Sequence, residues 1–156
     1  MKIQIIHAGD FKENYLVSAY SEYCKRIKGF SEITDIPIKE KPVTDMSQVE
    51  KALREEGQDI LSKIESRAFV VALCVEGKQL SSEEFASFFE KVTLDGYSNI
   101  TFIIGSSHGL SDEVKKRADL KLSFSKMTFP HQLMRVILSE QVYRALSIIN
   151  GSKYHK

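Results

Sequence analysis

The sequence predicts an α/β fold built on a mostly parallel sheet with flanking helices. Segments with strand character alternate with segments of helical periodicity five times along the 156 residues. Two strand segments, Ala68–Val75 and Asn99–Ile104, are continuously apolar, which is typical of strands covered on both faces. Internal repeats and low-complexity tracts are absent from the sequence, so we expect a single domain spanning residues 1–156.

The N-terminal unit is a predicted strand followed by a predicted helix. Lys2–Ala8 has strand character, and Gly9 ends it. Asp10 and Glu13, three residues apart, predict a capping pair for the following helix. Apolar residues at helical spacing indicate the helix itself: Leu16, Tyr20, Tyr23 and Ile27.

A weaker strand and a second helix come next. Phe30–Ile38 is the strand, and Pro37 favours a place at the edge of the sheet or at a strand end, because proline cannot donate a ladder hydrogen bond. Lys39–Met46 is a charged loop. Ser47 and Glu50 predict a capping box for the helix that follows.

The two apolar strands lie in the middle of the chain. Ala68–Val75 is the first of them, and we expect the chain to turn at Gly77. Ser81 and Glu84 predict a capping box for the helix that leads to the second apolar strand, Asn99–Ile104.

The C-terminal part repeats the same pattern. Gly105–Gly109 is a loop, a short helix opens at Ser111, and Leu120–Phe124 is the last strand. Pro130 suits the first turn of the final helix. Gly151 suits the end of that helix, because glycine adopts the left-handed conformation found there.

Three predicted loops are candidates for a ligand site. In open parallel sheets, ligands bind in a crevice beyond the carboxyl ends of the strands. The segments expected at that edge are Leu73–Gly77, Gly105–Gly109 and Ser125–Phe129.

The sequence offers little support for a phosphate-binding loop, a serine hydrolase or a metal site. The loop Gly105–Gly109 is not a G-x-G-x-x-G pattern and has no phosphate-loop lysine after it. Ser106 or Ser107 beside His108 offers a nucleophile and a base, but adjacent residues rarely align for that chemistry and no nucleophile-elbow motif surrounds them. The four histidines lack ligand spacing, so no metal site is predicted.

Cysteine use and charge bear on location and partners. Cys24 and Cys74 lie outside any C-x-x-C pattern, so we expect buried free thiols in a reducing, cytoplasmic environment. No apolar run is long enough to span a bilayer, and we expect neither a signal peptide nor membrane attachment.

Residues 120–156 carry a net charge of +5 and the first 119 residues carry −4. A polyanionic partner and chance surface charge both fit this distribution.

The final helix is apolar over most of its circumference, which indicates burial on more than one side. Because so small a chain has few elements to cover a helix twice, we expect a homodimer built on this helix. A central helix buried within a monomer is the alternative. Arg135, Glu140 and Arg144 interrupt the apolar surface and would form interface ion pairs or face a substrate.

The most specific stretch of the chain is L-S-F-S-K-M-T-F-P-H-Q-L-M-R-V, from Leu122 to Val136. It is accompanied by E-Q-V-Y-R-A at positions 140–145, K-E-x-Y at 12–15 and the closing Y-H-K. With this combination, the whole chain resembles the RlmH family. These are SPOUT-class, S-adenosylmethionine-dependent methyltransferases that act on N3 of a pseudouridine in the 23S RNA of the large ribosomal subunit. In one departure, Ser106 stands where the family loop usually has a second glycine.

The resemblance implies a C-terminal trefoil knot, a homodimer and a site for S-adenosylmethionine formed by the three loops. An apolar slot with backbone hydrogen bonds suits the adenine of this donor. By family position, the donor site takes Leu73, Gly105, Phe124, Ser125, Lys126, Met127, Thr128 and Phe129. The C-terminal tail would close over the donor site of the partner copy.

The same resemblance implies roles for the tail. Holding N3 of the pseudouridine in line with the donor methyl is mostly a positioning task, and a base helps because N3 carries a proton at neutral pH. His155 is the candidate base, and Tyr154 would stack on the target ring. Arg144 and Lys156 would stabilise charge on the base or hold phosphate.

Arg135 and His131 are further candidate contacts to RNA, although His131 could instead cap the first turn of the final helix. A lone domain offers little surface for specific binding of free RNA, so we expect assembled ribosomes to be the substrate. A non-catalytic ribosome- or RNA-binding relative with the same fold is the alternative, and tight binding of the donor would favour the enzyme.

Overall fold

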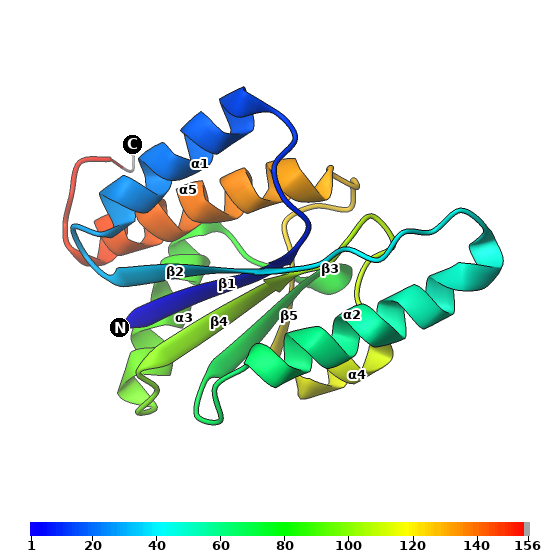
Figure 1. The fold of residues 1–156 in the computed structure, drawn as a ribbon. Helices are drawn as coiled ribbons and strands as arrows, with labels where there is room; N and C mark the ends of the chain where they lie inside the picture. Colours follow the sequence, from blue (N-terminus) through cyan, green and yellow to red (C-terminus); the bar gives the residue numbers. More distant parts are fainter. Residues whose placement is uncertain (155–156) are drawn as a thin grey trace.

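Five parallel strands form the centre of the structure (Figure 1). The computed structural model describes residues 1–154. Over these residues the strand order is β2-β1-β4-β3-β5, and every neighbouring pair is parallel. The strands are β1 (Lys2–Ala8), β2 (Glu32–Ile38), β3 (Phe69–Gln79), β4 (Asn99–Ile104) and β5 (Leu120–Ser123). The predicted fold class, with five alternations of strand and helix, is confirmed.

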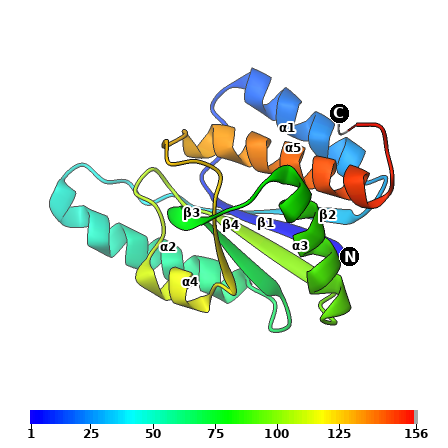
Figure 2. The ribbon, with the colours of Figure 1, turned by 180° about the vertical axis from the view of Figure 1, so that it is seen from behind.

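Helices cover both faces of the sheet. The helices are α1 (Asn14–Ile27), α2 (Val49–Lys63), α3 (Ser82–Leu94), α4 (Asp112–Arg117) and α5 (His131–Ile149), and a short 3-10 turn (Met46–Gln48) precedes α2. Helices α1, α3 and α5 lie on one face, and α2 and α4 lie on the other (Figures 1 and 2).

Alternating side chains of the inner strands fill two separate cores. In β1, Ile3 and Ile5 belong to the core under α1, α3 and α5, whereas Ile6 belongs to the core under α2 and α4. In β4, Phe102 and Ile103 divide between the two cores in the same way. Successive residues of a strand point to opposite faces. A strand covered on both faces is therefore apolar at nearly every position, as the sequence of β4 is.

One predicted helix cap is confirmed and another is wrong. At the start of α3, Ser81 Oγ accepts a hydrogen bond from the backbone nitrogen of Glu84 at 3.1 Å. The Glu84 carboxylate accepts from the backbone nitrogen of Ser81 at 2.7 Å, which completes the capping box. Asp10 does not cap α1. That helix begins at Asn14, and its N-cap residue, Glu13, makes no side-chain cap bond.

The capping box predicted from Ser47 and Glu50 is also wrong. The 3-10 turn starts before it, and the cap of this turn is Asp45, whose side chain accepts from the backbone nitrogen of Ser47 at 3.1 Å. Helix α2 then continues directly from the turn at Val49, without a side-chain cap. Of the two possible capping residues, Asp45 and Ser47, the earlier one forms the cap.

The end of β3 departs from the prediction. Instead of turning at Gly77, β3 continues to Gln79 and pairs again with β5. Leu73 and Lys78 both align with Leu122, so the residues between them form a bulge. Gly77 is needed for the close approach of these strands, since a Cβ there would lie 2.7 Å from the backbone nitrogen of Leu122.

Helix α5 is largely buried within the single chain. It packs between α1 and α3 and against the sheet (Figure 2). Leu133 and Ile149, near its two ends, are each 37% exposed. One chain therefore covers this helix more fully than we expected, and the apolar circumference does not by itself require a second copy.

Several smaller expectations can be compared with the structure. Pro37 lies in β2, which is an edge strand, as predicted. Gly151 has a φ of +67° directly after α5, as predicted for a helix end. Cys24 and Cys74 are free but only half-buried. Among the helices of residues 1–154, none is long and apolar enough to cross a membrane.

Replacing Gly77 with alanine should destabilise the fold, because the added methyl group meets strand backbone that cannot rotate away. We expect the free energy of unfolding in urea to fall by about 1–3 kcal/mol, the usual range for overpacking. Gly29→Ala is the matched control, since its Cβ would come no closer than 3.3 Å to another group. Equal stability of Gly77→Ala and the wild type would contradict the close approach of β3 and β5.

Candidate functional site

The carboxyl ends of β3, β4 and β5 surround a pocket of about 640 Å³. This volume is typical of small-molecule sites. All three predicted loop segments contribute to its lining, as does the first turn of α5. Seven of the eight residues predicted for the methyl donor line it: Leu73, Gly105, Phe124, Ser125, Met127, Thr128 and Phe129. The eighth, Lys126, is not part of the lining.

One wall of the pocket is apolar. Ile104, Leu122 and Phe124 line it, and Phe124 packs edge-to-face on Phe85 of α3, with ring centroids 6.3 Å apart. Met127 also lines the pocket although it is 74% exposed, which places it at the mouth. A slot of this kind suits a planar ring such as a nucleobase.

Two glycines shape the loop after β4. A Cβ on Gly105 would overlap the carbonyl oxygen of Gly109, and Gly109 has a φ of +88°. The backbone nitrogen of Gly109 donates to the carbonyl oxygen of Ser106 at 2.9 Å, which closes the turn. No non-glycine residue in the described part of the chain has a positive φ. Ser106 is therefore accommodated without backbone strain.

The Ser106 side chain is buried in the pocket wall and has no partner. It is 6% exposed, and its Oγ makes no hydrogen bond within residues 1–154. The neighbouring His108 is exposed. Among residues 1–154 neither Ser106 nor Ser107 is hydrogen-bonded to His108, so the structure does not bring together the nucleophile and base considered for this loop.

An ion pair at the pocket was not predicted. Glu76 lies in the bulge of β3 and Lys115 lies on α4, and Glu76 Oε1 is 2.5 Å from Lys115 Nζ. The hydrogen bond from Lys115 lowers the pKa of the Glu76 carboxyl, and the same bond raises the pKa of Lys115. The pocket thus presents both signs of charge beside its apolar wall. We missed this pair because we expected a turn, not a bulged strand, at this point.

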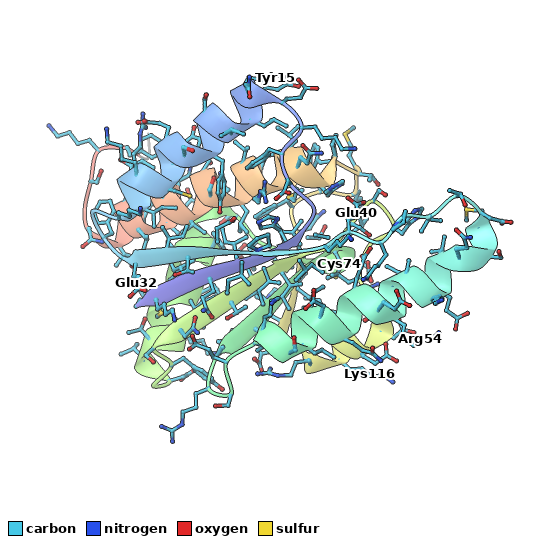
Figure 3. The ribbon with its side chains drawn as sticks, in the orientation of Figure 1. Tyr15, Glu32, Glu40, Arg54, Cys74 and Lys116 are labelled. Atoms are coloured by element: carbon cyan, nitrogen blue, oxygen red, sulfur yellow. The ribbon has the colours of Figure 1, made fainter. Side chains whose placement is uncertain are left out.

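His131 opens α5 and lines the pocket. Its Nε2 lies 3.7 Å from Oε2 of Glu40 and has no hydrogen-bond partner within residues 1–154. Figure 3 shows Glu40 on the segment that follows β2, beside the carboxyl edge of the sheet. The alternative in which His131 caps α5 is wrong, because that helix has no side-chain cap bond.

Tyr154 packs against α5 of its own chain. Its hydroxyl donates to Glu140 Oε1 at 3.1 Å, and its ring centroid lies 4.6 Å from that of Tyr143. The Arg144 guanidinium lies 4.9 Å from the Tyr154 ring and donates from Nε to Glu140 Oε1 at 3.0 Å. Glu140 therefore accepts hydrogen bonds from both Tyr154 and Arg144 of its own chain. We had expected an ion pair at an interface or a contact with substrate.

The surroundings of Tyr154 and Arg144 in this cluster determine their protonation states. Burial, and then the charge of Glu140, raise the pKa of Tyr154 to about 12. The hydrogen bond to Glu140 raises the pKa of Arg144. The phenol is thus neutral and the guanidinium charged at physiological pH. The predicted roles of His155 and Lys156 concern residues outside the described part of the chain.

Arg135 points into the interior and does not line the pocket. It is 4% exposed, and its guanidinium lies 3.5 Å from the centroid of the Phe11 ring and contacts His7. Burial lowers the pKa of Arg135, and the charge of Asp35 opposes that effect. Stacking on an aromatic ring compensates a buried guanidinium in part. In this structure Arg135 does not offer the exposed contact that we predicted for RNA.

A polar network beside Arg135, in which His7 and Tyr20 are buried and Asp35 is partly exposed, was also not predicted. His7 Nε2 lies 2.9 Å from Asp35 Oδ2, and the Tyr20 hydroxyl donates to Asp35 Oδ1 at 2.7 Å. Burial acts to raise the pKa of Asp35, but hydrogen bonds from His7 and Tyr20 lower it overall. The available signal was a histidine and an aspartate in the neighbouring strands β1 and β2. Their pairing became clear only from the register.

The fold and the pocket at the carboxyl edge agree with a match over nearly the whole sequence. Residues 1–155 match the family described as "Predicted SPOUT methyltransferase". The chain belongs to this class of methyltransferases.

Individual relatives define the family more closely. The chain is 49% identical over 160 residues to the ribosomal RNA large subunit methyltransferase H of Streptococcus mutans, covering 100% of both chains. It is 48% identical over 159 residues to the protein of that name from Carboxydothermus hydrogenoformans, again covering 100% of both. It is 49% identical over 154 residues to that from Caldicellulosiruptor bescii, covering 99% of each. The resemblance to this family inferred from the sequence is confirmed.

Replacing Glu140 with glutamine should lower the pKa of Tyr154 from about 12 toward its ordinary value of 10.0, because the nearby negative charge disappears. The difference in phenolate absorbance between each protein and its Tyr154→Phe derivative gives this titration. In the wild type, the raised pKa also means that Tyr154 contributes stability below about pH 10 that is lost as the pH rises toward 12.

Glu90→Gln, at an exposed position of α3, is the control for this titration and should leave it unchanged. A Glu140→Gln protein in which Tyr154 titrates as in the wild type would show that the two side chains do not interact in solution.

Proposed function

We propose that this protein transfers a methyl group from S-adenosylmethionine to N3 of a pseudouridine in the 23S RNA of the large ribosomal subunit. The observation that carries the proposal is the pocket at the carboxyl edge, where seven of the eight residues predicted for the donor meet. The relatives named ribosomal RNA large subunit methyltransferase H support the substrate class.

The pocket residues fit this donor. The apolar wall that includes Phe124 suits the adenine ring, and the tight turn at Gly105 and Gly109 lets backbone groups come close to it. The unpaired hydroxyl of Ser106 and the ion pair of Glu76 and Lys115 provide polar partners for the rest of the molecule. When bound, the donor supplies a methyl group already activated on a sulfonium. The protein has to orient the reactants and manage one proton.

The position of the tail supports a homodimer with composite sites. The pocket touches α5 at His131 and Met134, whereas Tyr154 contacts Glu140 and Tyr143. Along the helix, the rise is about 9 Å from Met134 to Glu140 and about 14 Å from Met134 to Tyr143. The Tyr154 of one chain thus lies apart from the pocket of that chain. A second copy docked on α5 would bring its tail to this pocket.

Each tail residue then has a role at the target base. Tyr154, kept neutral, would stack on the base or hydrogen-bond to it. Arg144, held by Glu140, would stabilise the negative charge that develops when N3 loses its proton. His155 would accept that proton, and Lys156 would hold phosphate.

Three further features belong to the proposal. The C-terminal part is threaded as a trefoil knot, which the adjacent loops after β4 and β5 support. The substrate is the assembled ribosome, because this small domain has little surface with which to bind free RNA specifically. The site of action is the cytoplasm, which the free cysteines support.

Incubation with radiolabelled S-adenosylmethionine and ribosomes that lack the modification should label N3 of one pseudouridine in the large-subunit RNA. Protein-free transcript should give far less label, because it lacks the shape of the assembled particle. Donor titration is the companion measurement. Tight donor binding without transfer to any ribosomal RNA would overturn the proposed reaction, and absence of both would favour a binding-only relative.

Mixed dimers should separate donor residues from tail residues. Gly105→Ala disrupts the donor loop, and Tyr154→Ala disrupts the tail, so each variant alone should be nearly inactive. A one-to-one mixture, reassociated from monomers, should recover about one quarter of wild-type activity, since half of the dimers are mixed and each has one intact composite site. No recovery in a mixture shown to contain mixed dimers would mean that each chain uses its own tail.

A further inference from the structure

We propose that the side-chain hydroxyl of Ser106 binds the methyl donor directly, through a hydrogen bond to a polar atom of its ribose or its amino-acid part. The inference rests on the proposed function, because it assigns a contact within the same pocket.

The first argument is that Ser106 is exceptional among the buried serines of residues 1–154. Ser123, Ser139 and Ser147 donate to the carbonyl oxygens of Ser125, Val136 and Tyr143 at 3.0, 2.8 and 2.8 Å. Ser111 accepts from the backbone nitrogen of Val114 at 3.3 Å. The Oγ of Ser106 alone has no partner, although it is equally removed from water.

The second argument is energetic. A buried hydroxyl without a partner destabilises a protein, so such groups are rare and call for a specific reason. Folding requires no serine here, because the turn is formed by the close approach of Gly105 to Gly109 and by a backbone hydrogen bond. Ser106 is one of the residues that line a pocket of ligand size. A bound molecule is the partner that the free protein lacks.

The third argument concerns the chemistry of the ligand. A hydroxyl can both donate and accept a hydrogen bond. It therefore fits a ribose hydroxyl, a carboxylate or an ammonium group, all of which the donor carries. The apolar wall at Phe124 is suited to the adenine, so the polar parts of the donor have to lie elsewhere in the pocket. Ser106 then adds affinity and selectivity for a ligand that has those groups.

The experiment measures two quantities on the same variants. The first is the dissociation constant of S-adenosylhomocysteine, a stable analogue of the donor, from the full-length protein. Ser106→Ala and Ser106→Gly should each bind it about three- to tenfold more weakly than the wild type, the usual effect of losing one neutral hydrogen bond. The second is the melting temperature without ligand. Ser106→Ala should melt at the same temperature as the wild type or higher, because an unpaired buried hydroxyl has been removed.

A purely structural role would give a different pattern. If Ser106 only supported the loop, the free Ser106→Ala protein would melt at a lower temperature, and that result would overturn the inference. Ser139→Ala is the matched control, since it removes a buried hydroxyl that has a partner and lies outside the pocket lining. It should lower the melting temperature and leave the dissociation constant unchanged.

Adenosine, which lacks the amino-acid part, identifies the atom involved. A weaker affinity of Ser106→Ala for adenosine would assign the contact to the nucleoside, and a loss confined to S-adenosylhomocysteine would assign it to the amino-acid part. Equal affinity of the wild type and Ser106→Ala for both ligands would refute the inference alone. A wild-type protein that binds neither ligand would refute the proposed function, and the inference with it.

Discussion

The pairing of β5 with β3 is the constraint on which the rest of the site depends. It brings the segment after β5 next to the segments after β3 and β4, so three parts of the chain meet at one edge. Gly77 permits this pairing, because only a glycine fits against the backbone of Leu122. Leu122 is in turn part of the pocket lining, so the strand contact and the ligand wall share a residue. The bulge next to Gly77 also explains why Glu76 reaches the pocket.

Helix α5 carries residues of two parts of the structure, the pocket and the cluster around Tyr154. Its first turn lines the pocket, and its middle holds Tyr154 and Arg144 through Glu140. The helix is packed between α1 and α3, so the pocket residues of its first turn and the Tyr154 contacts of its middle are held on one rigid element. A site on a rigid element keeps its geometry better than one on a loop. Two of the polar residues that interrupt the apolar helix, Glu140 and Arg144, lie where Tyr154 packs against it.

The order and type of the elements could be predicted from the sequence because apolar strands and amphipathic helices differ in period. The three loops at the carboxyl edge could be predicted from the order of the elements, whereas the individual residues proposed for the donor, such as Phe124, came from the resemblance. Two of the predictions that failed concern a helix cap and the end of a strand. The cap at Asp45 was an alternative to Ser47 within the same short stretch of sequence, whereas the bulge at Gly77 depends on pairing with β5, which lies far away in the sequence. The partner of Glu76, Lys115, was missed for the same reason, since the two residues lie 39 positions apart in the sequence. The pair of Glu140 and Arg144 is instead a local contact between residues four apart on one helix.

The place of β1 in the sheet has a consequence for synthesis of the chain. β1 pairs with β2 on one side and with β4 on the other, and the contact between Gln4 and Thr101 joins residues 97 positions apart. At a translation rate of 5–20 residues per second, roughly 5–20 seconds pass between the appearance of β1 and that of its second partner. During this time one edge of a strongly apolar strand has no neighbour. Early pairing with β2, which needs only the first 38 residues, therefore shields half of this nascent strand. The other edge of β1 stays unpaired until β4 has been made.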